Sequence, residues 1–135
     1  TSEAALALGR ALAEAVGAHV LLLKPERQDF IVATVSHLPY LLACALVATA
    51  DATTSADPAA WEVFAGGFRD TSRVAGSDVT MMMDILLTNR DEVLKALATY
   101  QAKLSDLTRL VAKGDEEEMW AALSAVRDER MRMYP

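Results

Sequence analysis

Apolar residues recur three or four positions apart through most of the chain, which is the spacing of one helix face. Near the N-terminus this stripe runs from Ala5 to Val16 within the segment 2–16, and Gly17 follows where a helix-ending glycine belongs. No segment shows the alternation of apolar and polar residues that predicts a strand. The pattern therefore predicts an all-α fold.

The last third of the chain has the most regular pattern. Asn89 with Glu92, and Asp115 with Glu118, each place a capping acceptor three residues before a glutamate, which predicts two helix starts. Gly114 is expected to end the first of these helices. Its apolar residues alternate four and three apart: Val93, Leu97, Tyr100, Leu104, Leu107 and Val111. This heptad-like seam is typical of helix-to-helix packing. The final helix continues it with Met119, Leu123 and Val126.

The centre of the chain is predicted to be one long helix. Pro25 suits its first turn, and the helix is expected to run to about Thr49. The twenty residues 31–50 contain no Asp, Glu, Lys or Arg, which is long enough to span a bilayer. A Ser-His pair and a proline interrupt them, however, and no basic cluster marks either flank. We therefore expect a buried helix, kinked at Pro39, which has no amide hydrogen for the Val35 carbonyl.

A polar loop is expected at residues 51–60, after the central helix. Residues 61–64 then predict a short helical piece, ended by the pair Gly66 and Gly67. A further helix, capped by Asp78 or the serine before it, holds three consecutive methionines. Methionine at helical spacing is usually a gap-filler in a core.

Length and composition indicate one soluble domain covering residues 1–135. At this length roughly two-thirds of the unfolded surface can be buried, and the contents of 53% hydrophobic and 24% charged residues are ordinary. The net charge of −6 argues against nucleic acid or an anionic membrane as a partner. A single cysteine, Cys44, allows no internal disulfide, which favours a cytoplasmic location.

The pair Ser36 and His37 lies in the most apolar part of the chain. An imidazole is costly to bury unless a partner bonds it. From the local sequence alone, a core histidine bonded to a carbonyl is favoured over a ligand-binding role. The serine hydroxyl can bond to a carbonyl one turn earlier.

A second group of polar residues follows the paired glycines. Arg69 and Arg73 are four apart, with Asp70 three residues before Arg73. Two guanidinium groups can grasp a carboxylate or phosphate through paired hydrogen bonds. A solvated helix with an internal Asp70–Arg73 pair explains the same spacing equally well. No metal site is predicted, because no carboxylate stands at helical spacing from His37.

Taken together, these two groups resemble the C-terminal helical domain of the prephenate dehydrogenases, a family of tyrosine biosynthesis that includes arogenate dehydrogenases. The matching text is SHLP at 36–39, GGFRDTSRVAGSD at 66–78 and DILLTNR at 84–90. The similarity extends from about Glu3 to Met131. SHLP alone is not specific, whereas the combination of motifs is.

The resemblance implies that an N-terminal Rossmann domain binds NAD or NADP and supplies the catalytic histidine. The all-α domain would form a homodimer and one wall of the substrate cleft. The reaction moves a hydride from the prephenate ring to the nicotinamide while the ring carboxylate leaves as CO₂. The product is 4-hydroxyphenylpyruvate, or tyrosine when the substrate is arogenate.

Carried over position by position, the resemblance also implies a set of substrate-binding residues. Arg73 occupies the position of the arginine that binds the substrate carboxylate, and Asp70 would hold it in one rotamer. His37 and Ser36 would position the substrate without transferring a proton.

Four positions depart from the family pattern, and one of them is Val79, which stands in place of a proline. Tyr40 stands where a second histidine is common, and Met82 stands where the family often has an aromatic residue. Gln28 replaces the histidine of a His-Asp pair one to two turns earlier. We include Tyr40 and Met82 among the substrate-binding candidates. The departures leave open whether the substrate is prephenate or arogenate, and whether tyrosine inhibits.

The chain contains no glycine-rich nucleotide turn, no catalytic histidine at a family position and no metal ligand set. It also starts without a methionine or a basic signal-peptide region. We therefore expect it to be part of a longer protein and to be inactive alone. A different class of function stays open, namely a free-standing helical dimerisation module without catalytic activity.

Overall fold

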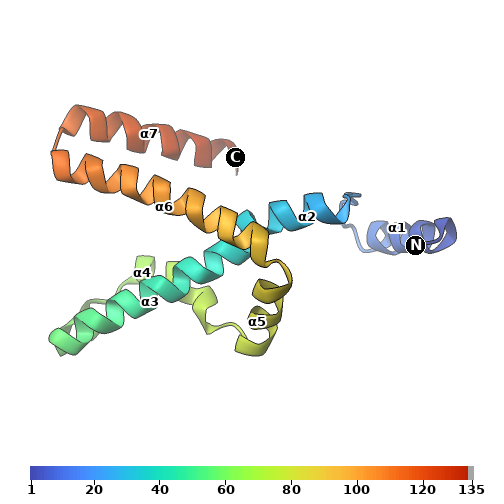
Figure 1. The fold of residues 1–135 in the computed structure, drawn as a ribbon, viewed down its shortest axis with the longest axis horizontal. Helices are drawn as coiled ribbons and strands as arrows, with labels where there is room; N and C mark the ends of the chain where they lie inside the picture. Colours follow the sequence, from blue (N-terminus) through green and yellow to red (C-terminus); the bar gives the residue numbers. More distant parts are fainter. Residues whose placement is uncertain (134–135) are drawn as a thin grey trace.

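In a computed structural model, which describes residues 1–133, the chain is helical almost throughout and contains no strand within that range (Figure 1). The prediction of an all-α fold is confirmed. The α-helices are α1 (Glu3–Ala15), α2 (Pro25–Val32), α3 (Leu38–Ala56), α4 (Gly66–Ser72), α5 (Val79–Thr88), α6 (Arg90–Lys113) and α7 (Glu116–Met133). The other helical segments are the π turn η1 (Ala33–His37) and the 3₁₀ segments η2 (Pro58–Val63) and η3 (Arg73–Gly76).

The long central helix consists of α2, η1 and α3 in direct succession. This helix departs from α geometry just before Pro39, where residues 33–37 form one π turn. In that turn the Leu38 amide donates to the Ala33 carbonyl five residues back. Single π turns inside α-helices are frequent at functional sites. The helix also runs on to Ala56 and η2 begins at Pro58, so the loop expected at residues 51–60 is wrong: only Asp57 of that range lies outside the helical segments. The hydroxyls of Thr53 and Thr54 bond carbonyls one turn earlier, which lets polar residues continue the helix.

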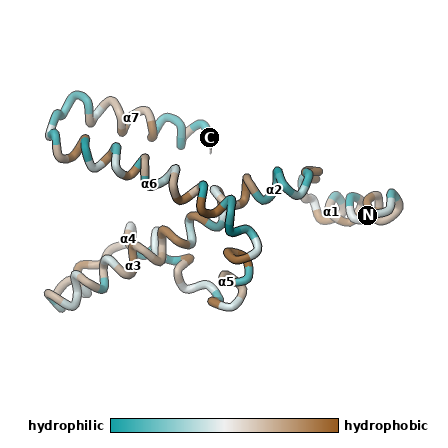
Figure 2. The backbone as a smooth tube through the Cα atoms, in the orientation of Figure 1, coloured by the Kyte–Doolittle hydropathy of each residue, from teal (hydrophilic) through white to brown (hydrophobic). Residues whose placement is uncertain are grey.

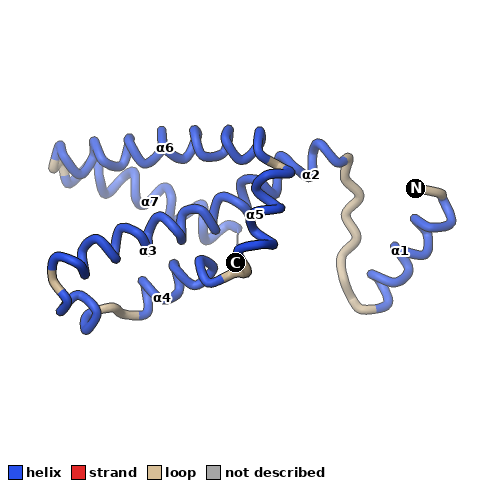
Figure 3. Tube along the Cα trace, turned by 60° about the horizontal axis from the view of Figure 1, so that its bottom comes forward, coloured by secondary structure: helices blue, strands red, loops and turns tan. Residues whose placement is uncertain are grey.

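The return from α3 begins with η2, which overlaps the short helical piece expected at residues 61–64 but begins three residues earlier, at Pro58. The rings of Trp61 and Phe64 meet edge to face 4.9 Å apart, and Phe64 stacks on Phe68 at 4.3 Å. Gly66 and Gly67 do not end a helix, as the sequence suggested, but start α4. Neither has a positive φ angle, so both take up ordinary helical backbone. Figure 3 shows α4 running back beside α3.

Three of the predicted helix ends are confirmed. The side chain of Asp78 caps α5 by accepting from the Met81 amide, and Asp115 caps α7 by accepting from the Glu118 amide. Gly114 ends α6 with a φ of 67°, a left-handed conformation that favours glycine. The capping box expected at Asn89 is wrong, because its side chain makes no cap bond and is used elsewhere.

The buried core is small and lies where the long helix crosses the start of α6. Its members are Ala33, Leu38, Val93 and Ala96, with Leu41, Leu42, Leu86, Leu97 and Tyr100 packed around them. The first half of the predicted α6 seam therefore packs within the chain. The second half does not, since Leu104 and Leu107 are 48% and 40% exposed and Val111 is more exposed still.

Much apolar surface remains uncovered. A compact protein of 14.6 kDa exposes about 6,900 Å², whereas this chain exposes 10726 Å². Helix α1 has no buried residue and is joined to the rest by an extended link, visible in Figure 3. Figure 2 shows hydrophobic stretches along the long helix and α5. The helices of this chain alone therefore do not pack into a compact globule.

The continuous helix Pro25–Ala56 is long and apolar enough to cross a membrane, judged by length and composition. Core helices of soluble proteins satisfy the same criteria. Within the most apolar 18-residue stretch of this helix, only 22% is buried by the rest of the chain. The sequence favours a buried helix over a membrane span, and this stays a prediction, because burial requires that other protein surfaces cover the helix.

Candidate functional site: the junction around His37 and Asn89

The π turn places His37 against α6. Its side chain is 8% exposed, and Ala33, four residues earlier on the same face, is 1% exposed. The imidazole is therefore desolvated in the small core. The prediction that His37 is buried and hydrogen-bonded is confirmed, but its partner is a side-chain amide and not a carbonyl.

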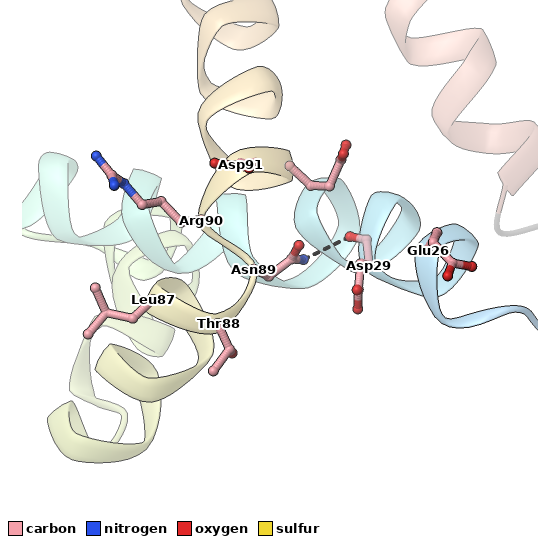
Figure 4. Close-up of a pocket in the computed structure, with 8 residues that line it drawn as sticks. Glu26, Asp29, Leu87, Thr88, Asn89, Arg90 and Asp91 are labelled. Carbon is pink, nitrogen blue, oxygen red and sulfur yellow. Dashed lines mark hydrogen bonds between the residues drawn. The ribbon is translucent and has the colours of Figure 1, made fainter. Parts of the chain in front are cut away.

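Asn89, in the turn between α5 and α6, supplies that partner. Its Nδ2 lies 3.3 Å from Nδ1 of His37 and 2.8 Å from the main-chain oxygen of Asp29 in α2. Figure 4 shows the amide reaching across toward Asp29, while the Arg90 side chain points to the other side. One side chain thus ties three segments together at the core.

Burial lowers the pKa of His37 below its ordinary value of 6.5. The negative charge of Asp29 acts in the opposite direction but does not offset the desolvation. The imidazole at this junction is therefore neutral at physiological pH.

An open cavity of about 440 Å³ adjoins the junction on the side of Asp29 and Asn89. Glu26, Asp91 and Glu92 also line it, so its walls are predominantly acidic. This cavity does not suit an anionic substrate. Among residues 1–133, no three or more His, Cys, Asp or Glu side chains are arranged so that they could hold a metal ion.

The other two residues of the SHLPY stretch point differently. Ser36 is exposed, on a different face of the helix from His37. Tyr40 is half-buried, and a hydrogen bond with the Cys44 thiol one turn later raises its pKa. Tyr40 is thus a neutral phenol at physiological pH.

Arg73 and Asp70 lie on the returning segment. Arg73 starts η3 directly after α4, and both side chains are exposed. Within the described residues no ion pair joins them, so the expected Asp70–Arg73 pair does not form in this chain. The Arg73 guanidinium is free to meet an anion from outside. Met82 is buried at 7% exposure, whereas its neighbours Met81 and Met83 are about half exposed.

No hydrogen bond or ion pair in the described part of the chain joins any two of the six candidate residues. The structure places His37 in the junction with α6, Arg73 at the start of η3 and Met82 in α5. Sequence reasoning missed Asn89 as a site residue, although it lies in the DILLTNR motif. Its capping position concealed its role, because local spacing cannot reveal a bond across 52 residues.

The fold and the junction define an all-α domain with large exposed apolar faces, which is typical of a domain that associates with other protein surfaces. The buried pair His37 and Asn89 lies where the long helix crosses α6. The sequence matches the family described as "Prephenate dehydrogenase, dimerization domain" over residues 24–125. The chain belongs to this family.

Among curated relatives, a prephenate dehydrogenase of Bacillus subtilis is 29% identical over 119 residues, which cover 88% of this chain and 32% of the relative. A solved prephenate dehydrogenase of Aquifex aeolicus, in complex with hydroxyphenyl propionate and NAD⁺, is 34% identical with a TM-score of 0.89. A solved arogenate dehydrogenase of Synechocystis is 28% identical with a TM-score of 0.85. Both matches cover 98% of this chain, but only 46% and 49% of the solved chains. The chain thus spans about a third of the curated relative and under half of the solved ones.

Proposed function

We propose that this chain is the dimerisation and substrate-binding part of an NAD(P)-dependent prephenate dehydrogenase that acts in the cytoplasm. The observation that carries the proposal is the match of 98% of this chain to 46% of a solved prephenate dehydrogenase. The full-length enzyme would oxidise and decarboxylate prephenate to 4-hydroxyphenylpyruvate. The 28% identity to an arogenate dehydrogenase makes arogenate the alternative substrate.

The partner is proposed to be a second copy of the chain. The exposed area exceeds that of a compact protein of this mass by roughly half. Obligate dimers bury about 2,000–5,000 Å² of mostly apolar surface. The exposed half of the α6 seam and the long helix offer such surface, and burying them would remove the apolar face from water.

Arg73 is proposed to bind a substrate carboxylate. The chain carries a net charge of −6, so an anionic substrate needs a local cation. The exposed guanidinium of Arg73, with no ion-pair partner in the described residues, offers two parallel donors for a carboxylate. Asp70, Ser36, His37, Tyr40 and Met82 would complete this wall of the cleft.

The residues of this chain do not fit NAD or NADP. Dinucleotide binding uses a strand, a glycine-rich turn and a helix, and the described residues contain no strand. The nucleotide and the catalytic histidine would therefore belong to a separate domain of the full-length protein, and this chain alone would be inactive.

The proposal is tested with the full-length protein. Purified enzyme is mixed with prephenate or arogenate and with NAD⁺ or NADP⁺, and nucleotide reduction is followed by absorbance together with CO₂ release. Prephenate-dependent reduction with matching CO₂ release supports the proposal. Reduction only with arogenate supports the alternative substrate, and no reduction with any combination overturns the enzyme and supports a free-standing helical module.

A further inference from the structure

The orientation of the Asn89 amide follows from its two contacts. The main-chain oxygen of Asp29 can only accept a hydrogen bond, so the atom 2.8 Å from it must be the amide nitrogen. This oxygen also accepts from the Ala33 amide and has a lone pair for each donor. Asp29 therefore fixes which way the Asn89 amide faces.

The second hydrogen of the same nitrogen is then available for His37. Nδ1 of His37 lies 3.3 Å away and faces a donor, so it must act as the acceptor. A neutral imidazole that accepts at Nδ1 carries its proton on Nε2. An imidazolium would set two N–H groups against each other, and burial disfavours that form as well.

Nε2 of His37 has no hydrogen-bond partner in the described chain. Yet no buried side-chain nitrogen or oxygen among residues 1–133 lacks a partner. Nε2 must therefore keep some contact with the surroundings, although the residue as a whole is 8% exposed. A buried ring with one fixed end and one open N–H end is suited to offer a directed neutral donor.

We propose that Asn89 is a positioning residue that presents His37 to the substrate as a neutral donor through Nε2–H. The proposal deepens the proposed function and rests on it. Asn89 itself does not touch the substrate. It sets the tautomer and the ring orientation of the histidine that does, and Asp29 in turn sets Asn89.

The tautomer is measured directly by NMR on full-length protein labelled with ¹⁵N-histidine. The His37 signals are identified by their loss in His37→Gln. Wild-type His37 is expected to show a protonated Nε2 and an unprotonated Nδ1 at neutral pH. A protonated Nδ1 in the wild type would overturn the proposal.

Asn89→Asp keeps the shape of the side chain but replaces the donor by an acceptor. The proton should then move to Nδ1 of His37, and the KM for the substrate should rise about tenfold or more, the scale of one hydrogen bond to a charged group. Thr88→Ala is the matched control, since Thr88 bonds only carbonyls of its own helix. It should leave the tautomer and KM as in the wild type.

A second pair of variants leaves Asn89 intact in case Asn89→Asp does not fold. His37→Gln keeps a neutral N–H donor near the position of Nε2, whereas His37→Leu removes it. KM should stay close to wild type in the first and rise about tenfold in the second. Equal KM values in the two variants would overturn the proposal.

The two levels of the hypothesis fail in different ways. If the full-length protein oxidises neither prephenate nor arogenate, the proposed function fails, and with it the role of His37 toward substrate. If the enzyme is active and Asn89→Asp moves the proton without changing KM, the proposed function stands and the positioning role is overturned.

Discussion

The side-chain amide of Asn89 donates a hydrogen bond to the main-chain oxygen of Asp29 over 2.8 Å, although the two residues are 60 positions apart. The bond fixes the start of α6 against α2, at the point where the small core lies. The rest of α6 extends away from this point, and α7 folds back beside it (Figure 1). The junction is therefore the fixed point of the fold, and the helices that leave it are available to other surfaces.

The exposed half of the α6 seam provides the first prediction. Leu104→Asp combined with Leu107→Asp should convert the full-length protein from a dimer to a monomer at micromolar concentration, because it places two charges in an apolar interface. Size-exclusion chromatography with light scattering measures the mass. Ala98→Asp, exposed on the far side of α6 from the seam, adds a charge without touching it and should leave a dimer. A wild-type monomer, or a double variant that still dimerises, would contradict this prediction.

Arg73 provides the second prediction. Arg73→Ala in the full-length enzyme should lower kcat/KM by on the order of 10²-fold, the scale of a lost charge-assisted pair. Arg73→Lys keeps the charge but not the two-pronged geometry, and should fall in between.

The matched control for Arg73 is Arg69→Ala, which removes another exposed guanidinium one turn earlier. A general loss of positive charge would affect both variants alike, whereas direct contact with the substrate affects only Arg73. Wild-type kinetics in Arg73→Ala would remove Arg73 from the site.

The sequence was sufficient for the helices whose signals are local. The caps Asp78 and Asp115 and the glycine Gly114 act within one turn, so spacing alone located them. It was not sufficient for Asn89, which offered the same local signal but bonds residues 52 and 60 positions away. The side chain of a residue at a helix start can bond either the amides of that helix or groups on another segment. For Asn89 only the tertiary packing decides between these two.

The candidate site was predictable from the sequence only as a set of residue types. The resemblance to a family singled out His37 and Arg73, but spacing along a chain does not show that the first is buried and the second exposed. The Asp70–Arg73 pair was inferred from helical spacing. That spacing breaks down because α4 ends at Ser72 and a tighter 3₁₀ turn follows.

Tyr40 provides the third prediction, which concerns the choice of substrate. Prephenate carries a keto group on its side chain where arogenate carries an ammonium group. A neutral phenol and an imidazole bond these groups differently, so Tyr40→His should change the ratio of kcat/KM for the two substrates by about tenfold, equal to about 1.4 kcal/mol. Steady-state kinetics with both substrates measures this ratio.

The control for Tyr40 separates the phenol from its neighbour. Cys44→Ala removes the thiol that bonds the Tyr40 hydroxyl but leaves the phenol in place. The ratio should change less in Cys44→Ala than in Tyr40→His. An unchanged ratio in Tyr40→His would show that position 40 does not select the substrate.

The buried imidazole of His37 provides the fourth prediction, which concerns stability against pH. Its pKa in the folded protein lies below the ordinary value of 6.5, so the unfolded chain takes up this proton first as the pH falls. The contribution of His37 to stability is therefore complete above pH 6.5 and is lost as the pH falls toward the lower, folded pKa. The slope in this window is at most about 1.4 kcal/mol per pH unit for one group.

Thermal unfolding of the full-length protein at several values between about pH 7.5 and 5.5 measures this effect. His37→Gln should flatten the fall in Tm over this range, because the group that titrates is gone. His19→Gln, which changes the other histidine of the chain on the exposed link after α1, should leave the fall in place. The low pKa of Asp115, caused first by the bond from the Glu118 amide, confines its own effect to more acidic solutions. Equal slopes in wild type and His37→Gln would show that His37 does not resist protonation in the folded state.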